Sequence, residues 1–237
     1  MITGDLPIAL RAKIAAWWDT SALWTVQFDV SAGGAYYYYL RSRYGGAWSS
    51  YNRLTYGTYY VGKPYKTAGG LLAVGGVAAA NPKLQSTNAS NFSMGTDPRT
   101  QIFRFRQESP GYVASFGKYE IDKYEGVKTT DGTLVIDRMD AGSNIETGAA
   151  CGNGAHTVAI LYASGTYEIR LDGVTVAVES RTSVAPGLTK IGFLGACDQT
   201  SVHAAGKAGE MILWNRKLSP GEIIMAEKYL AGKWRFT

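Results

Sequence analysis

The stretch GEMILWNRKLSPGEIIMAEKYLAGKW, residues 209–234, decides the fold, because it joins a short apolar strand to one capped helix. The run 210–214 (EMILW) has the length and apolar content of a buried strand. Ser219 stands at the position of a helix N-cap, Pro220 follows at the first helical position, and Glu222 lies three residues after the cap. This capping box predicts a helix that begins directly after the strand and its turn.

Apolar residues recur along the predicted helix at helical spacing and form one stripe: Ile223, Ala226 and Leu230. Glycine commonly follows the last turn of a helix, so we expect this one to stop at Gly232. A shorter helix is expected near the N-terminus, over residues 6–16. The predicted helical content is therefore small and lies near the two ends of the sequence.

The remaining sequence predicts short strands separated by glycines and turn residues. The run 100–106 (TQIFRFR) alternates and places Phe103 and Phe105 on one strand face. The Asp-Gly pair at 172–173 is typical of a two-residue hairpin turn. Further strands are expected at residues 134–136, 156–162, 166–171, 174–179 and 190–194.

Strands this short and regularly spaced are typical of antiparallel sandwiches. We therefore predict an all-β fold, a two-sheet antiparallel jelly-roll sandwich with a short C-terminal helix, formed by residues 1–237 as a single domain. Residues 33–100 are its irregular part, rich in Tyr and Gly. Within it, the run 61–91 is expected to form a long loop, because Gly, Ala, Ser and Asn dominate there.

The composition is that of a globular protein that needs neither a disulfide nor a metal to fold. Its 237 residues are 46% hydrophobic and 18% charged, which is enough to bury a large core. The N-terminal residues lack the pattern of a signal peptide, and no apolar run reaches membrane-spanning length. Cys151 and Cys197 are interpreted as free thiols or as a pair across a turn.

The net charge of +5 is concentrated in one stretch without acidic residues. No Asp or Glu occurs between Asp29 and Asp97, whereas basic residues occur at positions 41, 43, 53, 63, 66 and 83. Such a segment can face nucleic acid, an anionic glycan or an acidic partner subunit. We favour a protein interface, and nucleic acid is the weaker alternative because no nucleic-acid-binding motif is present.

Ten of the 16 tyrosines fall between Tyr36 and Tyr65, inside this basic stretch. Tyrosine anchors interfaces and stacks on sugar rings, and it loses little side-chain entropy on binding. Because successive side chains of a strand face opposite sides, Tyr36 and Tyr38 are expected to share a face that Tyr37 does not. The predicted binding or interface residues are Tyr36, Tyr38, Arg41, Arg43, Trp48, Tyr51 and Arg53.

The chain resembles the laminin-G-like, concanavalin A-like jelly-roll domains of phage virion and bacterial surface proteins. The resemblance rests on TYEIRLDGVTVAV (166–178), KIGFLG (190–195) and the closing segment 209–234, and AAWWDTSAL (15–23) resembles the family's opening strand. No family pattern is visible between about 33 and 100. The matching closing positions are Trp214, Asn215, Arg216, Leu218, Ser219, Glu222, Tyr229, Leu230, Ala231, Lys233 and Trp234.

One string, EIDKYE (120–125), suggests enzymatic activity. It resembles the Glu-x-Asp-x-x-Glu motif of a concanavalin-like glycoside hydrolase family that includes laminarinases, and this implies catalytic roles for Glu120, Asp122 and Glu125. Against that role, Lys123 stands where the family has an apolar residue, and the closing segment matches the binding relatives. The alternative is that Glu120 and Asp122 lie on a solvated strand face.

We therefore predict a non-enzymatic structural or adhesion protein of a phage virion, such as a capsid decoration, fibre or tail component, assembled in the host cytoplasm. Its expected partners are other virion subunits, copies of itself and a host-surface glycan, with no membrane. The alternatives are a secreted or cell-surface bacterial carbohydrate-binding module and the glycoside hydrolase. No cofactor or metal site is predicted, although Asp19, Asp29 and Asp198 are candidate Ca²⁺ ligands.

Overall fold

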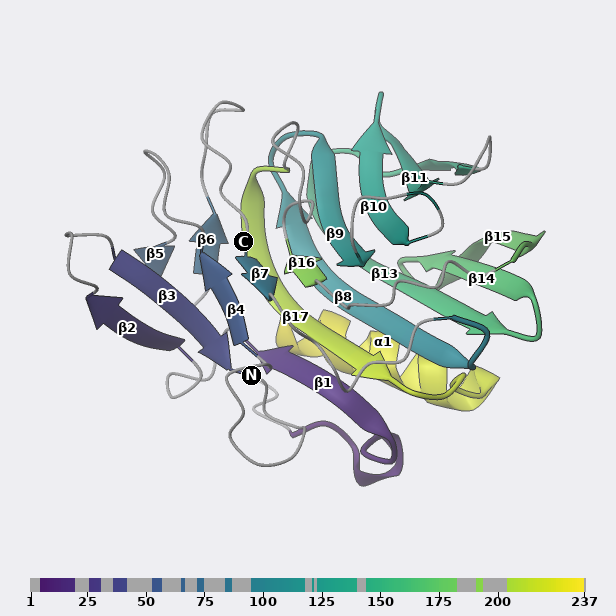
Figure 1. Cartoon of the computed structure of the whole chain (residues 1–237), viewed down its shortest axis with the longest axis horizontal. Coiled ribbons are helices and arrows are strands. Elements are labelled where there is room, and N and C mark those ends of the chain that lie inside the picture. Colours follow the sequence, from purple (N-terminus) through teal and green to yellow (C-terminus); the bar gives the residue numbers. More distant parts are fainter. Residues whose placement is uncertain are drawn as a thin grey trace.

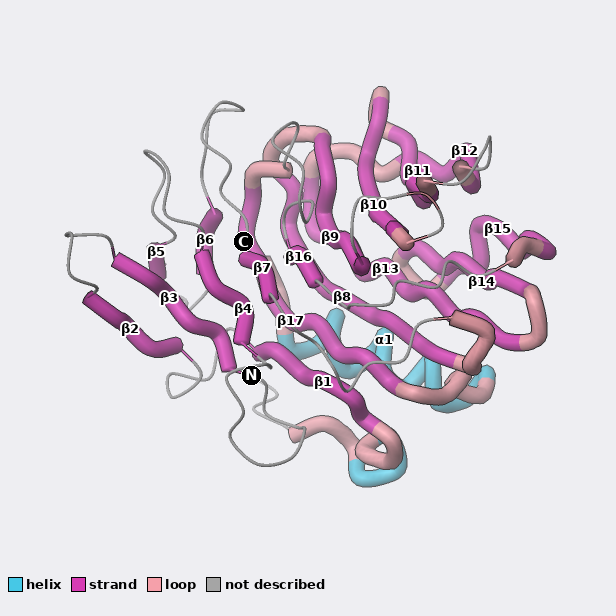
Figure 2. Tube along the Cα trace, viewed as in Figure 1, coloured by secondary structure: helices cyan, strands magenta, loops and turns pink. Residues whose placement is uncertain are grey.

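Two antiparallel sheets stack on each other, and one helix lies against the outer face of one of them (Figures 1 and 2). The structure is a computed structural model. For the strands between residues 26 and 86 and for residue 193, the structure describes the backbone but not the side chains. The residues that it describes are 5–19, 26–30, 36–41, 53–56, 65–66, 72–74, 84–86, 95–117, 121, 123–139, 144–182, 191–193 and 204–236.

The sheet next to the helix contains eight of the described strands. They are β1 (Ile14–Asp19), β5 (Tyr65–Lys66), β6 (Leu72–Val74), β8 (Arg99–Gln107), β13 (Gly154–Ala163), β14 (Thr166–Leu171), β15 (Val174–Ser180) and β17 (Gly206–Trp214). Their order is β15-β14-β13-β8-β17-β6-β5, with β1 also paired to β17. The first and last strands of the chain therefore lie side by side.

The second sheet contains nine described strands. They are β2 (Val26–Val30), β3 (Tyr36–Arg41), β4 (Arg53–Tyr56), β7 (Leu84–Ser86), β9 (Gly111–Gly117), β10 (Tyr124–Thr130), β11 (Thr133–Arg138), β12 (Ile145–Ala150) and β16 (Ile191–Phe193). Their order is β12-β11-β10-β9-β16-β7-β4-β3-β2. The predicted all-β sandwich with antiparallel sheets is confirmed.

The central strands β8, β13 and β17 of the eight-stranded sheet are buried on both faces. Along β8, Phe103 and Phe105 belong to the core between the two sheets, as their alternation predicts. Ile102 belongs instead to a second core, beneath the helix α1 (Pro220–Lys233). Strand β13 follows the same pattern, since Ile160 faces the first core and Leu161 the second. Burial on both faces explains why the run 156–162 reads as almost continuously apolar.

The capping box of α1 is confirmed. The Ser219 hydroxyl accepts a hydrogen bond from the Glu222 N–H, and the Glu222 carboxylate accepts one from the Ser219 N–H at 2.9 Å. Hydrogen bonds from the Arg216 guanidinium and the Ser219 N–H lower the pKa of Glu222 to about 2. The helix continues through Gly232 and ends at Lys233, because the Trp234 N–H still bonds to a carbonyl of the last turn.

Two sequence motifs from opposite ends of the chain meet at the buried carboxylate of Glu210 in β17. This carboxylate accepts hydrogen bonds from four side chains: Trp17, Tyr229, Lys233 and Trp234. The Lys233 ammonium also lies 2.6 Å from the Asp19 carboxylate in β1. The opening and closing segments therefore meet in one polar cluster that fixes the helix to the sheet.

Two sequence-based expectations differ from the structure. The helix predicted over residues 6–16 is wrong, because this stretch holds only a 3-10 turn, η1 (Ile8–Leu10), followed by β1. Lys13 between them has a φ of 56°, which interrupts a right-handed helix. The run 61–91, expected as a loop within the irregular part 33–100, contains the short strands β5, β6 and β7. Strands of two or three residues are too short to show alternation, so long-range pairing defines them.

Candidate functional site

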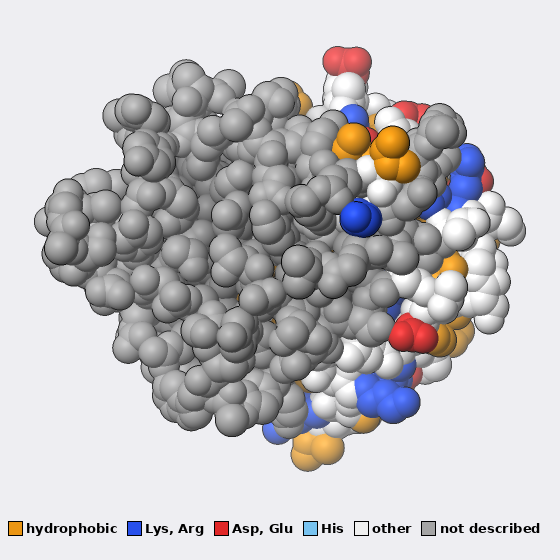
Figure 3. Space-filling model, viewed as in Figure 1, with side chains coloured by type: hydrophobic (Ala, Val, Ile, Leu, Met, Phe, Trp, Pro, Cys, Tyr) orange, Lys and Arg blue, Asp and Glu red, His pale blue; other side chains and the backbone are white. Residues whose placement is uncertain are grey.

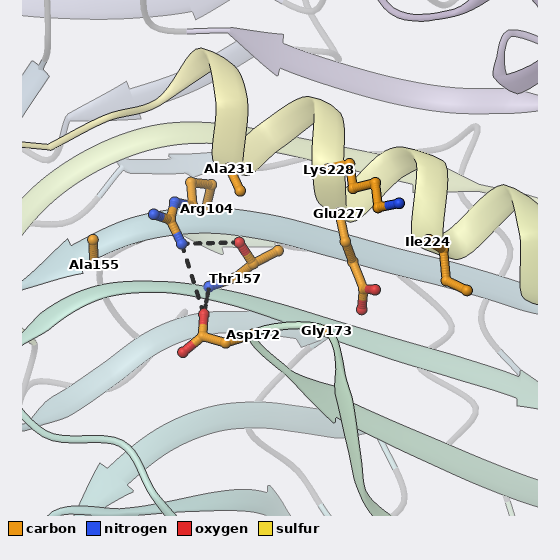
Figure 4. A pocket seen from close by; sticks show the side chains of 9 residues that line it. All are labelled: Arg104, Ala155, Thr157, Asp172, Gly173, Ile224, Glu227, Lys228 and Ala231. Atoms are coloured by element: carbon orange, nitrogen blue, oxygen red, sulfur yellow. Dashed lines mark hydrogen bonds and ion pairs between the residues drawn. The ribbon is translucent and has the colours of Figure 1, made fainter.

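A pocket of about 610 Å³ opens between α1 and the hairpin of β14 and β15 (Figure 4). Strands β8 and β13 supply the side of the pocket opposite the helix, and the hairpin turn closes one end. Its volume lies in the range of pockets that hold small-molecule ligands. It is lined by Arg104, Ala155, Thr157, Asp172, Gly173, Ile224, Glu227, Lys228 and Ala231.

The hairpin turn explains how Asp172 reaches the pocket. Asp172 and Gly173 have φ values of 49° and 86°, the left-handed pair of a type I′ turn, as the Asp-Gly pair predicts. The Asp172 N–H donates to the Thr157 carbonyl at 2.8 Å, and its carboxylate accepts from the Thr157 N–H at 2.7 Å. The turn thus holds the carboxylate firmly against the neighbouring strand β13.

Arg104 lies beside this carboxylate. Its Nη1 donates to the Thr157 hydroxyl at 3.0 Å and lies 3.7 Å from an Asp172 oxygen (Figure 4). Its Nε is buried and has no hydrogen-bond partner among the described residues. Burial lowers the pKa of Arg104, and the charge of Asp172 offsets only part of that shift. The guanidinium is therefore held in place while part of its hydrogen-bonding capacity is unused.

His156 adds a second contact to Asp172, behind the pocket. Its Nδ1 lies 2.8 Å from an Asp172 oxygen, and its Nε2 lies 3.0 Å from the Gly152 carbonyl oxygen. Both partners are acceptors, so both ring nitrogens can be satisfied together only by the protonated imidazolium. The hydrogen bond to Asp172 raises the pKa of His156. Burial alone would raise the pKa of Asp172, but hydrogen bonds from His156 and the Thr157 N–H lower it.

Glu227, on the helix side of the pocket, forms an ion pair with Arg170 of β14. Two guanidinium nitrogens of Arg170 donate to the two Glu227 oxygens at 2.8 and 3.0 Å, and one of them also donates to the Gly173 carbonyl at 2.6 Å. The Glu227 hydrogen bond raises the pKa of Arg170. This bidentate pair fastens the hairpin turn to the helix and so fixes the width of the pocket.

We expect His156 to titrate above the ordinary histidine pKa of about 6.5, because Asp172 stabilises its charged form. A raised folded-state pKa means that this contact stabilises the fold below about pH 6.5 and that the stabilisation disappears as the pH rises through the folded-state value. An NMR titration can measure this midpoint directly, since the chain has only 2 histidines.

The Asp172→Asn variant should lower the NMR midpoint of His156. Glu179→Gln is the matched control, since Glu179 is a carboxylate of the same hairpin that pairs with Arg181. A His156 midpoint that does not move in Asp172→Asn would contradict the assigned contact.

The nine-stranded sheet carries a second polar cluster on the face away from the inter-sheet core. Tyr112 and Tyr124 are both buried and meet edge to face with their ring centres 6.2 Å apart. A Cβ atom at Gly126 would lie 2.7 Å from the Tyr112 ring and 2.8 Å from the Tyr124 ring, so only glycine fits between them. The Tyr112 hydroxyl donates to Asp137, and Lys128 lies 3.5 Å from the same carboxylate. The two tyrosine rings are therefore buried packing residues, and they do not offer an exposed surface on which a sugar could stack.

The Tyr- and Arg-rich segment enters this same sheet. The backbone register places Arg41 of β3 directly opposite Arg53 of β4. When the paired residues are followed from strand to strand across the sheet, Tyr39 lies in the same row as Ser115 of β9 and Gly126 of β10. Tyr38 does not lie in this row. Tyr36 and Tyr38 pair with Val30 and Phe28 of β2. Arg43, Trp48 and Tyr51 lie outside the described residues, so the predicted interface stays a prediction.

Glu125 is the described member of the three suggested catalytic carboxylates, and it lies in the interior. Its side chain is fully buried, accepts from Arg99 at 3.0 Å and from the Tyr167 hydroxyl at 2.8 Å, and faces the side of β10 opposite to Tyr124. Here Glu125 serves as the anion of a buried ion pair. Glu120 and Asp122 lie outside the described residues.

Of the three candidate Ca²⁺ ligands, the structure describes the side chain of Asp19 alone. Asp19 is paired with Lys233, the side chain of Asp29 is not described, and Asp198 lies outside the described residues. Within the described ranges, no group of three His, Cys, Asp or Glu side chains could hold a metal ion, and no helix is long and apolar enough to cross a membrane. Cys151 is a buried free thiol whose pKa burial raises to about 12. Cys197 lies outside the described residues.

The sequence predicts the elements that carry the central pocket residues but not their meeting. Arg104 falls in the predicted strand 100–106, His156 begins the predicted strand 156–162, and Asp172 belongs to the predicted hairpin turn. One signal was available: two strands joined by a tight turn place residues near 157 opposite Asp172. The contribution of the helix could not be read, because it depends on how α1 crosses the sheet.

The two stacked antiparallel sheets and the terminal helix define a jelly-roll β-sandwich. No protein-family model and no curated protein matches the chain. Among solved structures, the binding domain of botulinum neurotoxin serotype D/C superposes with a TM-score of 0.60 at 12% identity, over 93% of this chain and 53% of that chain. The chain thus spans about half of that toxin domain. This similarity shows the fold alone.

Two further solved structures are also similar. The CBM40 module of the Ruminococcus gnavus IT-sialidase, bound to α2,3-sialyllactose, has a TM-score of 0.46 at 16% identity, over 56% of this chain and 84% of that chain. A heptameric SAP-like pentraxin from Limulus polyphemus has a TM-score of 0.49 at 12% identity, over 65% of this chain and 79% of that chain. The laminin-G-like relationship stays a prediction.

Proposed function

We propose that this chain is a non-enzymatic adhesion domain that binds a glycan in the pocket between α1 and the β14–β15 hairpin. The observation that carries the proposal is a pocket of saccharide size with both apolar and hydrogen-bonding walls. Ile224, Ala155 and Ala231 offer aliphatic surface for the C–H face of a sugar ring, and Ile224 is 43% exposed. Arg104, Thr157 and Asp172 offer donors and acceptors for hydroxyl groups.

The charges in the pocket favour binding over hydrolysis. A retaining or inverting glycosidase needs one carboxyl group that stays protonated and a second that is free to act as a nucleophile or base. Asp172 is held in its charged form by His156, and Glu227 is held by two hydrogen bonds from Arg170. Neither described carboxylate is available for proton transfer, so the pocket is suited to holding a ligand.

Adhesion on a phage virion is the setting that we propose for this binding. Its support is the acid-free segment rich in Tyr and Arg, whose composition is typical of subunit interfaces. A virion component is expected to assemble as a symmetric oligomer. Sedimentation of the purified chain tests this setting separately from ligand binding: an oligomer is expected, and a monomer at micromolar concentration would argue against it.

Ala231→Trp should abolish glycan binding without unfolding the protein. Ala231 is an exposed helix residue that lines the pocket, so an indole there fills the pocket and leaves the core unchanged. The measurement is a glycan array with the purified chain, followed by calorimetry with the best ligand. Met225→Trp is the matched control, since Met225 is an exposed residue of the same helix that does not line the pocket. Equal binding by both variants would place the glycan elsewhere.

A further inference from the structure

We infer that the pocket selects an acidic saccharide, whose carboxylate or sulfate binds Arg104, with Lys228 as a second cation of the pocket lining. The inference rests on the proposed glycan binding and adds the chemical class of the ligand. It begins from the pairing of charges in the pocket. The lining contains two basic residues, Arg104 and Lys228, and two acidic ones, Asp172 and Glu227.

Both acidic residues are neutralised from outside the pocket. Glu227 receives a bidentate pair from Arg170, which does not line the pocket. An oxygen of the Asp172 carboxylate lies 2.8 Å from Nδ1 of His156, and His156 does not line the pocket either. Their negative charges are therefore largely cancelled before a ligand arrives. The two lining cations then give the pocket an excess of positive charge.

Arg104 has hydrogen-bonding capacity to spare. A guanidinium has five N–H donors, and the described contacts of Arg104, to Thr157 and Asp172, come from Nη1 alone. Its Nε is buried with no hydrogen-bond partner among the described residues. The Phe236 ring, 5.7 Å from the guanidinium carbon, covers the other side of this group. A planar oxyanion is the ligand group that matches a guanidinium held in a fixed orientation, and it would bind the guanidinium through nitrogens other than the enclosed Nε.

Lys228 supplies the second cation from an exposed turn of α1, and the described part of the chain gives it no ion-pair partner. The aliphatic wall and the volume of about 610 Å³ exceed what an inorganic anion would fill. Among the side chains described on the face seen in Figure 3, basic and acidic residues are interspersed. The preference for an anion is assigned to the two cations that line this pocket.

The test compares acidic oligosaccharides with neutral counterparts that differ only at the anion. The probes are a hyaluronan tetrasaccharide, trigalacturonate and a chondroitin 6-sulfate tetrasaccharide. The first two are paired with their carboxyl-reduced forms and the third with its desulfated form, and calorimetry is done at low ionic strength. We expect at least one acidic probe to bind about tenfold or more tightly than its counterpart, because a charge-assisted pair is lost in the neutral form.

Variants then locate the anion. Lys228→Gln should lower the affinity for the acidic probe about fivefold and leave the affinity for the neutral probe unchanged, since a single partly exposed cation is removed. Arg104→Lys keeps the charge but removes the planar fork, and it should also weaken the acidic probe selectively. Arg235→Gln is the control, because Arg235 is an exposed cation after the same helix and does not line the pocket. It should change neither affinity.

The outcomes separate the inference from the proposed function. If acidic and neutral probes bind equally and Ala231→Trp blocks both, the glycan site stands and the anion preference is overturned. If none of the probes binds and the glycan array also shows no binding, both the proposed glycan binding and the anion preference are overturned. If inorganic sulfate or phosphate competes at the affinity of the best oligosaccharide, the site is a plain anion site, and the inference of a saccharide is overturned.

Discussion

Replacing Lys233 with methionine should lower the free energy of unfolding by about 3–5 kcal/mol, because it removes the ammonium that neutralises the buried Glu210 carboxylate. The side chains of Asp19 and Glu210 are 1% and 0% exposed, and the Lys233 ammonium lies 2.6 and 2.8 Å from their oxygens. Two indoles and a phenol would still donate to Glu210, but they cannot neutralise its charge. Urea denaturation followed by tryptophan fluorescence measures the loss.

The stability of the Lys233→Met variant should also depend on pH in a defined direction. Burial raises the pKa of Glu210 even in the unmodified chain, and removing Lys233 removes the charge that opposes this shift. A carboxyl group with a raised folded-state pKa binds its proton more tightly when folded, so stability rises as the pH falls. The deficit should shrink between about pH 8 and pH 5. Lys217→Met, at a lysine that is 36% exposed, is the control and should change stability by less than about 1 kcal/mol.

Arg99→Met should have a comparable effect on the other side of the sheet, about 3–5 kcal/mol. Arg99 and Glu125 are both fully buried and 3.0 Å apart, and Arg99 also donates to the Tyr167 hydroxyl at 3.0 Å. Its guanidinium lies 4.6 Å from the centre of the Tyr162 ring. Removing Arg99 therefore leaves the buried Glu125 side chain with the hydrogen bond from the Tyr167 hydroxyl but without its cation.

A double variant separates the loss of the ion pair from the loss of packing. Arg99→Met combined with Glu125→Leu should be more stable than Arg99→Met alone, because no charge then remains buried. A single substitution at Glu125 bears on the enzymatic alternative. If Glu125→Gln folded with unchanged stability while the unmodified chain cleaved laminarin and the variant did not, Glu125 would be a catalytic residue and its structural role would be contradicted.

The closing segment could be predicted in detail because its information is local. The Ser219 cap, the stripe of Ile223, Ala226 and Leu230, and the Asp172-Gly173 turn each act within a few residues. Dihedral preferences and capping hydrogen bonds are set at that range, so a short window of sequence contains them. The alternation of Phe103 and Phe105 was readable for the same reason.

Other features escaped prediction because their causes are distant in sequence. The strands β5 to β7 are too short for periodicity and exist through pairing with β17, β4 and β16. The burial of Glu125 depends on Arg99 and Tyr167, 26 and 42 residues away. A sequence motif can suggest a catalytic carboxylate, but only the side of the strand on which it lies decides what surrounds it.

The sequence by itself determined an antiparallel sandwich closed by one capped helix, since periodicity, turn chemistry and capping are properties of neighbouring residues. Only the tertiary structure decided where a ligand can bind. Arg104, Asp172 and Lys228 come from a strand, a turn and a helix that are far apart in the chain, and the crossing of α1 over the sheet brings them to one pocket. Packing also decides which of these charges are cancelled, because Arg170 and His156 reach their carboxylates only in the folded chain.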